Sequence, residues 1–272
     1  MKSASKPREV SFEDFVQYFP HAPTALCIKE CARLAALRRY ECKGPILDVG
    51  CGDGLFAKIA FASEEVWGID IDANEGRWAQ ASRAYEQIVI GDVTRAKLPE
   101  GFFATCIANC SLEHVPGIER ALDNIYRSLA PGARAYLFVP QREWASAMRS
   151  VRTLRGVGAE GLARKLQDRV DSTFEHHHLY DERGWREMVG RTKLTIESIE
   201  PVLTSATTSA FELFLLPSLA GWFNKRLTTR WTNFPRVRQR FAPVAYALAQ
   251  AALQAGDPAP TGEFLIVCKR PG

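Results

Sequence analysis

The chain has 272 residues, which is enough to bury one sizeable core with additions or two small cores. Apolar residues make up 46% of the chain and charged residues 24%, and this composition excludes disorder on a large scale. The formal net charge of +4 is too small to indicate a nucleic-acid partner by itself.

The seven cysteines show no paired spacing that would predict a disulfide framework, so we expect reduced thiols. Glu13 and Asp14 fall where a signal peptide needs an apolar run. The longest apolar stretches, residues 213–223 and 242–253, are too short to span a bilayer. The expected location is therefore the cytoplasm.

Residues 1–43 are predicted to form an N-terminal helical cap, with helices between residues 11 and 40. The aromatic face of this cap consists of Phe12, Phe15, Tyr18 and Phe19. Pro23 suits the first turn of the second helix, because proline is tolerated where no helical N–H is needed. Gly44-Pro45 then breaks the helix.

After residue 44 strands and helices alternate, which predicts an α/β fold with a doubly wound parallel sheet. The predicted strands are Ile46–Val49, Val66–Asp70, Gln87–Ile90, Thr105–Asn109, Ala135–Val139, Leu194–Leu203 and Phe264–Cys268. The predicted helices are Leu55–Phe61, Glu75–Tyr85, Ile118–Leu129 and residues 181–190. Pro131-Gly132 is predicted to turn the chain into the fifth strand.

Two connections, residues 141–180 and 204–262, are too long to be structureless loops in this plan. We expect both to be mostly helical and functional. The predicted core therefore comprises residues 44–140, 181–203 and 263–272. Residues 141–180 form a lid insertion, and residues 204–262 form an apolar and basic helical insertion.

The most informative motif is the glycine-rich turn at residues 47–54, between a predicted strand and a predicted helix. Gly50, Gly52 and Gly54 let the backbone turn tightly and approach a ligand, and a helix start offers N–H groups. A plain glycine-rich turn is the simpler alternative. A dinucleotide site would need a third glycine where Leu55 stands. No Tyr-x-x-x-Lys pair occurs, which also disfavours a short-chain dehydrogenase.

Four further motifs follow, and the whole set resembles class I S-adenosylmethionine-dependent methyltransferases. They are Gly68-Ile69-Asp70, Gly91-Asp92-Val93, Asn109-Cys110-Ser111-Leu112-Glu113-His114-Val115 and Pro131-Gly132-Ala133. The set is most similar to the small-molecule subfamily with a Leu-Glu-His motif after the fourth strand. Ala104, Asp72 and Ala133 depart from the usual pattern, but none of them is an expected cofactor contact. The resemblance implies a Rossmann-like sheet of seven mostly parallel strands with an antiparallel last strand.

The resemblance also implies S-adenosylmethionine as the cofactor. Asp70 would accept both ribose hydroxyls, and Asp92 would meet the adenine amino group, with the Val93 N–H at a ring nitrogen. The cofactor-binding residues expected on this basis are Asp48, Gly50, Cys51, Gly52, Gly54, Asp70, Ile71, Asp92, Val93, Asn109 and Cys110. Each acid also has a structural interpretation as a turn residue at the end of a strand.

The expected catalytic residues are Glu113, His114 and one of three consecutive histidines, for which we choose His177. The carboxyl end of a strand places Glu113 and His114 on the rim where ligands bind in open α/β sheets. An imidazole suits a hydroxyl acceptor, whereas a carbon or amine acceptor needs only a carboxylate or carbonyl. Packing or helix capping is the alternative for His114. We expect no metal, because no further ligands flank residues 176–178 at a recognisable spacing.

In the family the last strand runs antiparallel to the sixth, so both insertions are expected to fold over the acceptor pocket beside the N-terminal helices. From Leu213 to Gly256 there is no Asp or Glu, whereas basic and aromatic residues interleave. The basic residues are Lys225, Arg226, Arg230, Arg236, Arg238 and Arg240. This composition predicts a hydrophobic or lipid-linked acceptor and peripheral contact with an anionic membrane through residues 211–241. A helical lid with a solvated basic face is the alternative.

Two other classes compete with a small-molecule methyltransferase. A nucleic-acid methyltransferase would suit the basic and aromatic surface. However, Cys110-Ser111-Leu112 follows Asn109 in place of a Pro-Pro-aromatic motif, and no Pro-Cys dipeptide occurs. A regulatory protein that binds the cofactor without turnover is the third class. The sequence favours methyl transfer to oxygen or carbon of a small acceptor.

Overall fold

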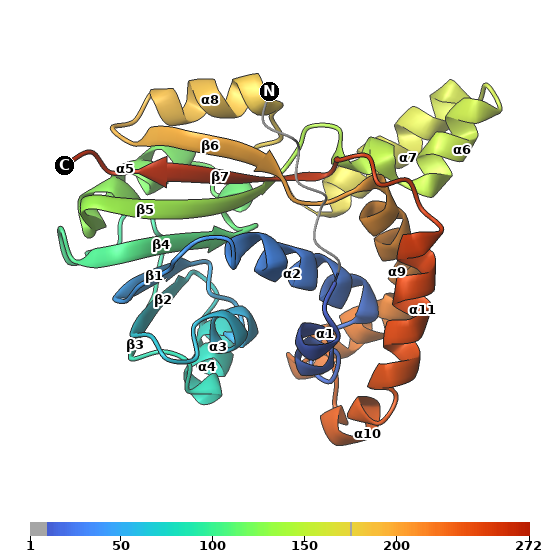
Figure 1. The fold of residues 1–272 in the computed structure, drawn as a ribbon, viewed down its shortest axis with the longest axis horizontal. Coiled ribbons are helices and arrows are strands. Elements are labelled where there is room, and N and C mark those ends of the chain that lie inside the picture. The colour runs from blue at the N-terminus through green and yellow to red at the C-terminus, as the bar shows by residue number, and fades with distance from the viewer. Residues whose placement is uncertain (1–9, 175) are drawn as a thin grey trace. The chain divides into compact units, whose positions relative to one another are not determined.

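The computed structural model describes residues 10–174 and 176–272, which form two compact units (Figure 1). The sheet unit comprises Tyr40–Glu143, Asp171–Glu200 and Glu263–Gly272. The helical unit comprises the described residues up to Arg39, together with Trp144–Val170 and Pro201–Gly262. Each unit is therefore assembled from segments that lie far apart in the sequence.

Within the described residues, the sheet unit contains a seven-stranded sheet in the order β3-β2-β1-β4-β5-β7-β6. The strands are β1 (Ile46–Val49), β2 (Val66–Asp70), β3 (Gln87–Ile90), β4 (Phe103–Asn109), β5 (Leu129–Pro140), β6 (Thr195–Pro201) and β7 (Glu263–Lys269). The first five strands pair in parallel, whereas β7 pairs with β5 in the antiparallel direction. This topology confirms the predicted doubly wound, mostly parallel sheet.

Strand β5 is longer than predicted because it begins at Leu129, before Pro131-Gly132. Phe103 of β4 pairs with Leu129, but Thr105 pairs with Arg134, so the register shifts between these pairs. Gly132 has a φ of 80°, which glycine adopts at little cost. Pro131-Gly132 is therefore a bulge inside the strand and not a turn before it.

The helices of the sheet unit are α3 (Leu55–Ala60), α4 (Ala73–Ser82), α5 (Ile118–Ser128), α8 (Glu182–Gly190) and the short 3₁₀ helix η1 (Leu112–His114). Helix α4 begins earlier than predicted because the Asp72 side chain accepts a hydrogen bond from the Asn74 N–H and caps it. It ends earlier because Arg83 adopts the left-handed conformation, with a φ of 58°.

One apolar cluster forms the core of the sheet unit. Helix α5 presents a buried face at helical spacing, which consists of Ile118, Ala121, Leu122 and Ile125. These side chains join Trp185 of α8 and the buried residues of the central strands. Strands β1 and β4 are almost continuously apolar and buried, as parallel strands inside a sheet usually are.

The helical unit contains α1 (Phe12–Tyr18), α2 (Thr24–Leu37), the 3₁₀ helix η2 (Trp144–Ala147), α6 (Arg149–Gly156), the start of α7 (Glu160–Thr173), α9 (Ser205–Thr228), α10 (Pro235–Gln239) and α11 (Ala242–Gln254). Helix α2 packs against α1 and α9, and α11 packs against α1 and α9. Pro23 immediately precedes α2 and is not within its first turn. The two long connections are thus mostly helical, as their length predicted.

Arg238 of α10 is a structural residue of the helical unit. Its guanidinium donates to the Phe19 carbonyl (2.6 Å) and the Ala22 carbonyl (2.9 Å) and lies 4.1 Å from the centre of the Phe19 ring. Burial lowers its pKa. Arg238 therefore ties α10 to the connection between α1 and α2 and does not belong to an exposed basic surface, contrary to expectation.

None of the described helices has both the length and the apolar character needed to cross a bilayer. The seven cysteines all lie within the described residues, and none forms a disulfide.

Candidate active site

The glycine-rich turn leaves β1 at Val49 and enters α3 at Leu55. Gly50 has a φ of 72°, and a Cβ at this position would lie only 2.3 Å from the Ser111 Cβ. Ser111 itself donates a hydrogen bond from Oγ to the Val49 carbonyl (2.5 Å). By contrast, a Cβ on Gly52 would meet no described atom within 4 Å. The loop is therefore tightly packed at Gly50 and open on the side of Gly52.

Asp70, at the end of β2, holds this loop through its carboxylate. Oδ2 accepts a hydrogen bond from the Gly52 N–H (2.9 Å), and Oδ1 accepts one from the Asp72 N–H (2.9 Å). Each carboxylate oxygen can accept more than one hydrogen bond. Both oxygens can therefore also receive hydroxyl donors from a ligand beside Gly52.

Tyr85 supports the same loop, although the sequence motifs did not point to it. Its hydroxyl donates to Asp48 Oδ2 at 2.7 Å, and the Asp48 side chain is almost fully buried. Burial, followed by the nearby Asp48 charge, raises the pKa of Tyr85, so the phenol stays a donor. Tyr85 is 37 residues from Asp48 in the chain, so only the packing of α4 and β3 against β2, which pairs with β1, brings the two together.

The loops after β2 and β3 lie at the same edge of the sheet as the glycine-rich turn, where the parallel strands end. Ile71 is 75% exposed, which leaves an apolar surface beside Asp70. Asp92 accepts a hydrogen bond from the Thr94 N–H at 2.8 Å, which lowers the Asp92 pKa and keeps the carboxylate charged. The Val93 side chain is buried in the core, so only its backbone can face a ligand.

The turn after β4 is a strained part of this edge. Cys110 has a φ of 50°, which is uncommon for a residue with a Cβ, and its N–H donates to the Phe138 carbonyl (3.0 Å). Asn109 precedes it as the last residue of β4. Such strain persists only where the surroundings enforce it, and here it directs the chain into η1 with Glu113 and His114.

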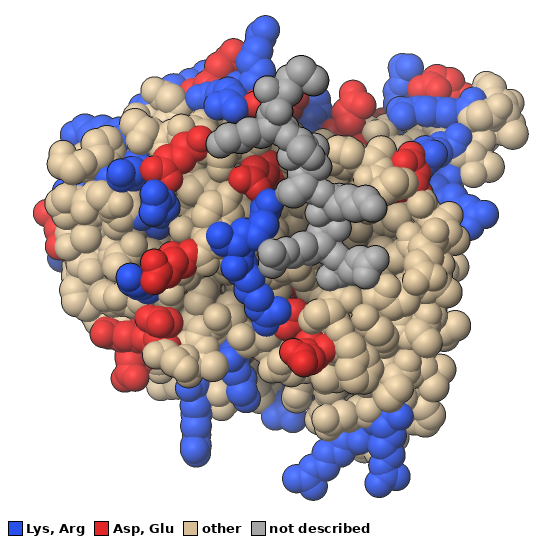
Figure 2. All heavy atoms as spheres, viewed as in Figure 1, with Lys and Arg blue, Asp and Glu red and all other residues tan. Residues whose placement is uncertain are grey.

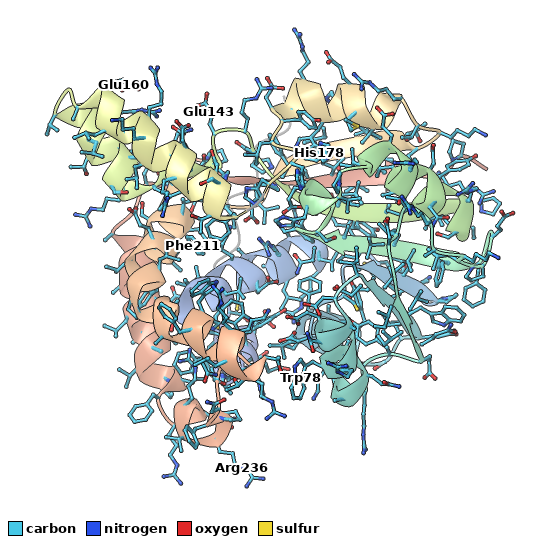
Figure 3. The ribbon with its side chains drawn as sticks, turned by 180° about the vertical axis from the view of Figure 1, so that it is seen from behind. Trp78, Glu143, Glu160, His178, Phe211 and Arg236 are labelled. Atoms are coloured by element: carbon cyan, nitrogen blue, oxygen red, sulfur yellow. The ribbon has the colours of Figure 1, made fainter. Side chains whose placement is uncertain are left out.

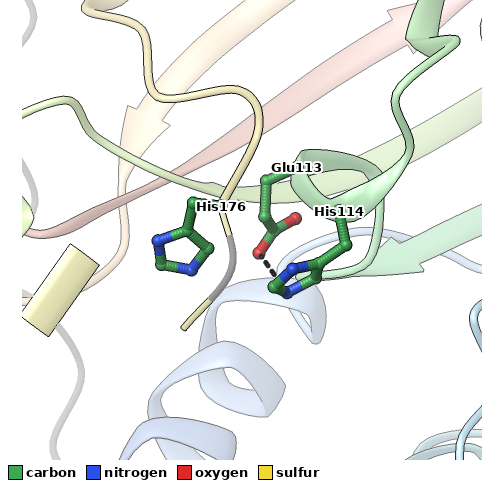
Figure 4. Close-up of side chains that lie close together, drawn as sticks. All are labelled: Glu113, His114 and His176. Carbon is green, nitrogen blue, oxygen red and sulfur yellow. Dashed lines mark ion pairs between the residues drawn. The ribbon is translucent and has the colours of Figure 1, made fainter. Parts of the chain in front are cut away.

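Glu113 and His114 form a cluster with His176, and their metal-ligating atoms all lie within 4.8 Å of one another (Figure 4). His114 Nε2 is 3.9 Å from Glu113 Oε1. The Glu113 side chain is 1% exposed and that of His114 is 43% exposed. The cluster therefore has a buried carboxylate behind an imidazole that solutes can reach.

The segment of three histidines contributes His176 to this cluster, in place of the expected His177. The backbone N–H groups of His177 and His178 both donate to the Glu113 carbonyl, at 2.8 and 3.1 Å. These bonds hold the segment against η1, with the His177 side chain exposed. His178 Nε2 lies 2.9 Å from the Val115 carbonyl, and its Nδ1 lies 3.0 Å from the Tyr180 hydroxyl. Both nitrogens of His178 are thus engaged elsewhere.

The sequence matches the methyltransferase domain family over residues 19–199, which is more than half of the chain. The chain therefore belongs to this family.

Two curated relatives each match about a third of the chain. An uncharacterized methyltransferase of Mycobacterium tuberculosis is 37% identical over 90 residues, which are 32% of this chain and 46% of that protein. A malonyl-[acyl-carrier protein] O-methyltransferase of Pectobacterium atrosepticum is 29% identical over 101 residues, which are 37% of this chain and 40% of that protein. The chain thus spans less than half the length of these curated relatives.

Solved structures share the fold over most of the chain. A geranyl diphosphate C-methyltransferase from Streptomyces coelicolor, in complex with Mg²⁺, geranyl diphosphate and S-adenosylhomocysteine, has a TM-score of 0.56 and 13% identity. This match covers 90% of this chain and 83% of that one. The [4+2]-cyclase SpnF has a TM-score of 0.54 and 16% identity, covering 89% of this chain and 81% of that one. Because a cyclase has the same fold, the fold alone does not identify the reaction.

S-adenosylmethionine is the cofactor of this chain, and the residues of the sheet unit fit it. The open side of Gly52 leaves room for a ligand against the loop. The Asp70 carboxylate lies beside it with acceptor capacity for two hydroxyls, and exposed Ile71 offers an apolar contact for a flat ring. The individual contacts with the cofactor stay predictions for all the expected residues, namely Asp48, Gly50, Cys51, Gly52, Gly54, Asp70, Ile71, Asp92, Val93, Asn109 and Cys110.

Replacing Asp70 by Asn keeps the side chain's size but exchanges one acceptor oxygen for a donor group. We expect the dissociation constant for S-adenosylmethionine, measured by calorimetry, to rise roughly 10- to 100-fold, since hydrogen bonds to a charged group contribute about 1.5–3 kcal/mol. Asp72→Asn is the matched control, because Asn caps a helix as well as Asp does. Unchanged affinity in Asp70→Asn would contradict the assigned role.

Replacing Tyr85 by Phe removes the donor to the buried Asp48 carboxylate. We expect the free energy of unfolding to fall by about 1–3 kcal/mol and the affinity for S-adenosylmethionine to fall with it, because the loop is less well held. Denaturant unfolding and calorimetry measure the two effects. Tyr136→Phe, in the buried part of β5, is the control. If both variants bind the cofactor as the wild type does, the Tyr85 hydroxyl does not position the loop.

Proposed function

We propose that the chain transfers the methyl group of S-adenosylmethionine to an oxygen or carbon atom of a small acceptor with a hydrophobic, lipid-like part. The cofactor supplies a methyl group already activated on a sulfonium, so the protein mainly has to hold and orient the acceptor. The observation that supports this acceptor class is the exposed surface of residues 213–248, which we call the apolar–basic surface.

The apolar–basic surface holds most of the exposed large apolar side chains. Of the fifteen such side chains among the described residues, nine lie between residues 213 and 248. They are Leu213, Trp222, Phe223, Leu227, Phe234, Val237, Phe241, Val244 and Leu248. Leu227 is 85% exposed and Phe234 is 73% exposed. A concentration of exposed apolar side chains on a protein usually marks an interaction surface.

The charges of the apolar–basic surface all have one sign, because no Asp or Glu occurs from Leu213 to Gly256. Over α10 and α11 the surface in Figure 2 is largely uncharged, and basic side chains project at its lower end. Arg236 lies on α10 at this end of the helical unit (Figure 3). Lys225 Nζ is 4.5 Å from the centre of the Trp231 ring. Cations beside exposed apolar groups favour a partner that is both anionic and apolar.

The names of two relatives agree with this acceptor class. The structural neighbour from Streptomyces coelicolor is named for geranyl diphosphate, in which a hydrocarbon chain carries an anionic group. The relative from Pectobacterium atrosepticum is named for a malonyl group on an acyl carrier protein. The first name describes a hydrocarbon chain with an anionic end, which is the chemistry that the apolar–basic surface favours, and the second describes a small acyl group on a carrier.

We assign activation of the acceptor to the cluster of Glu113, His114 and His176. The cluster lies just beyond β4, at the same edge as the glycine-rich turn, because Ser111 contacts both Val49 and Gly50. Its exposed member, His114, is the group that meets the acceptor, and the buried Glu113 orients and polarises it. His176 takes the place that we had given to His177. The expectation that the two insertions cover the acceptor stays a prediction.

Methyl transfer to the proposed acceptor class can be tested with labelled cofactor. We expect label from methyl-labelled S-adenosylmethionine to enter the solvent-extractable lipids of a cell extract, and not its nucleic acids or water-soluble metabolites. Asp70→Asn should lower the label by roughly 10- to 100-fold at cofactor concentrations below the dissociation constant. His114→Ala should retain cofactor binding but lower labelling by at least about 100-fold, as removal of an acid–base group does. His177→Ala should label as the wild type does.

The other outcomes of this assay contradict the proposal in different ways. Label in RNA or DNA would favour a nucleic-acid methyltransferase. Cofactor binding without label in any fraction would favour a regulatory protein.

We further propose that residues 211–241 contact an anionic membrane, where a lipid-like acceptor is met. The wild type should sediment with vesicles that contain anionic lipid at low salt and dissociate at high salt. Reversing two charges, as in Arg236→Glu with Arg240→Glu, should weaken partitioning by roughly 30-fold or more, since each basic residue contributes about 1 kcal/mol. Equal sedimentation with zwitterionic vesicles, or no sedimentation, would contradict the proposed contact.

The control for the vesicle assay is Arg164→Glu with Lys165→Glu on α7. This variant has the same change in net charge, and both side chains are exposed. Glu160 and Asp168 occur on the same helix, so this region lacks the single sign of charge. We expect the control to bind vesicles nearly as well as the wild type does.

A further inference from the structure

The cluster of Glu113, His114 and His176 combines two imidazoles and one carboxylate from segments about sixty residues apart. We propose that these three side chains bind one divalent transition-metal ion. This inference goes beyond the methyl transfer proposed above, and in the loaded site the ion, and not a free His114 imidazole, would meet the acceptor. Binding of the ion itself needs neither cofactor nor acceptor.

The donor set defines the class of ion. Two histidine nitrogens and one carboxylate oxygen are the ligands of catalytic zinc sites and of non-haem iron sites. Mg²⁺ and Ca²⁺ prefer sets made entirely of oxygen. The cluster therefore fits Zn²⁺, Fe²⁺ or Co²⁺ better than Mg²⁺. Three protein ligands also leave at least one position for water or a substrate oxygen.

The distances in the cluster are close to those that a bound ion requires. His114 Nε2 and Glu113 Oε1 are 3.9 Å apart, and no pair of the three ligand atoms exceeds 4.8 Å. A tetrahedral ion about 2.1 Å from its ligands holds them roughly 3.4 Å apart. Rotation of the 43% exposed His114 side chain can provide much of the contraction. The buried Glu113 supplies a fixed point.

The backbone and the aromatic rings already hold the ligands next to one another. The N–H groups of His177 and His178 bond to the Glu113 carbonyl, which joins the histidine segment to η1. The Phe174 ring stacks on His176 with ring centres 5.8 Å apart, and the His114 ring lies 5.2 Å from the His176 ring. A site assembled in advance loses less conformational entropy when it binds an ion.

His178 and six of the seven cysteines are poor competitors for the ion. Both ring nitrogens of His178 are engaged by the Val115 carbonyl and the Tyr180 hydroxyl. A metal-binding cysteine must be a thiolate, and burial raises the pKa of Cys42 and Cys268 to about 12. Burial also raises the pKa of Cys27, Cys31, Cys51 and Cys106. These thiols therefore stay protonated at neutral pH.

Co²⁺ is a suitable probe because its visible absorption reports the coordination number, and a thiolate ligand adds a separate charge-transfer band. We expect the full chain to bind one Co²⁺, with a spectrum of nitrogen and oxygen ligands, and Zn²⁺ to displace it. His176→Ala and His114→Ala should each weaken Co²⁺ binding by at least about 100-fold, the upper range for loss of a supporting residue. His177→Ala, which alters the exposed neighbour, should bind Co²⁺ as the wild type does.

Two results of the Co²⁺ assay would overturn the proposed metal site. It is overturned if the wild type gives no Co²⁺ spectrum, or if the spectrum and affinity survive His176→Ala. Calorimetry with S-adenosylmethionine shows that each variant is folded, because the cofactor residues lie outside the cluster. The methyl-labelling assay of the proposed function gives a separate result. If methyl label enters another class of acceptor but Co²⁺ binds as expected, only the proposed acceptor is wrong and the metal site stands.

Discussion

The hydrogen bond between the Gly52 N–H and Asp70 Oδ2 is the interaction on which the cofactor-binding edge of the sheet depends, where β1 and β2 end. A glycine-rich turn has many accessible conformations, so its order must come from partners outside it. Asp70 supplies one partner from the end of β2, and Tyr85 fixes Asp48, two residues before Gly50. Parallel strands make this arrangement possible, because β1 and β2 end at the same edge in register.

The same turn also positions the acceptor side of the site. Gly50 has no side chain, so Ser111 can approach the backbone and donate to the Val49 carbonyl. Ser111 immediately precedes η1, which carries Glu113 and His114. A side chain at Gly50 would displace Ser111 and, with it, the cluster. The glycine-rich turn and the cluster of Glu113, His114 and His176 are thus coupled by close packing. The strained backbone of Cys110 is an unfavourable contribution that this packing must offset.

Local signals explain what the sequence could predict. The strands of the core are apolar runs between turn residues, and the glycine-rich turn is contiguous, so both were found to within a few residues. The bulge in β5 was missed because it depends on pairing with β4. Tyr85 and Arg238 were missed as structural residues because their partners lie far along the chain. Among the three adjacent histidines, the His176 side chain meets Glu113 and His114, while the N–H groups of His177 and His178 bond to the Glu113 carbonyl. Which of the three acts in catalysis stays a prediction.

The reaction must be decided by what is added to the shared fold, because proteins with this fold include a cyclase. Two additions stand out among the described residues. The segment 176–178 brings His176 to a motif of the core, and so converts a buried carboxylate and one imidazole into a cluster with three donors. Residues 213–248 add exposed apolar side chains and basic charge without any acid. Keeping so much apolar surface in water is unfavourable by about 25 cal/mol for each Å². A partner that covers this surface would recover that free energy, and the absence of acids in this segment favours an anionic one.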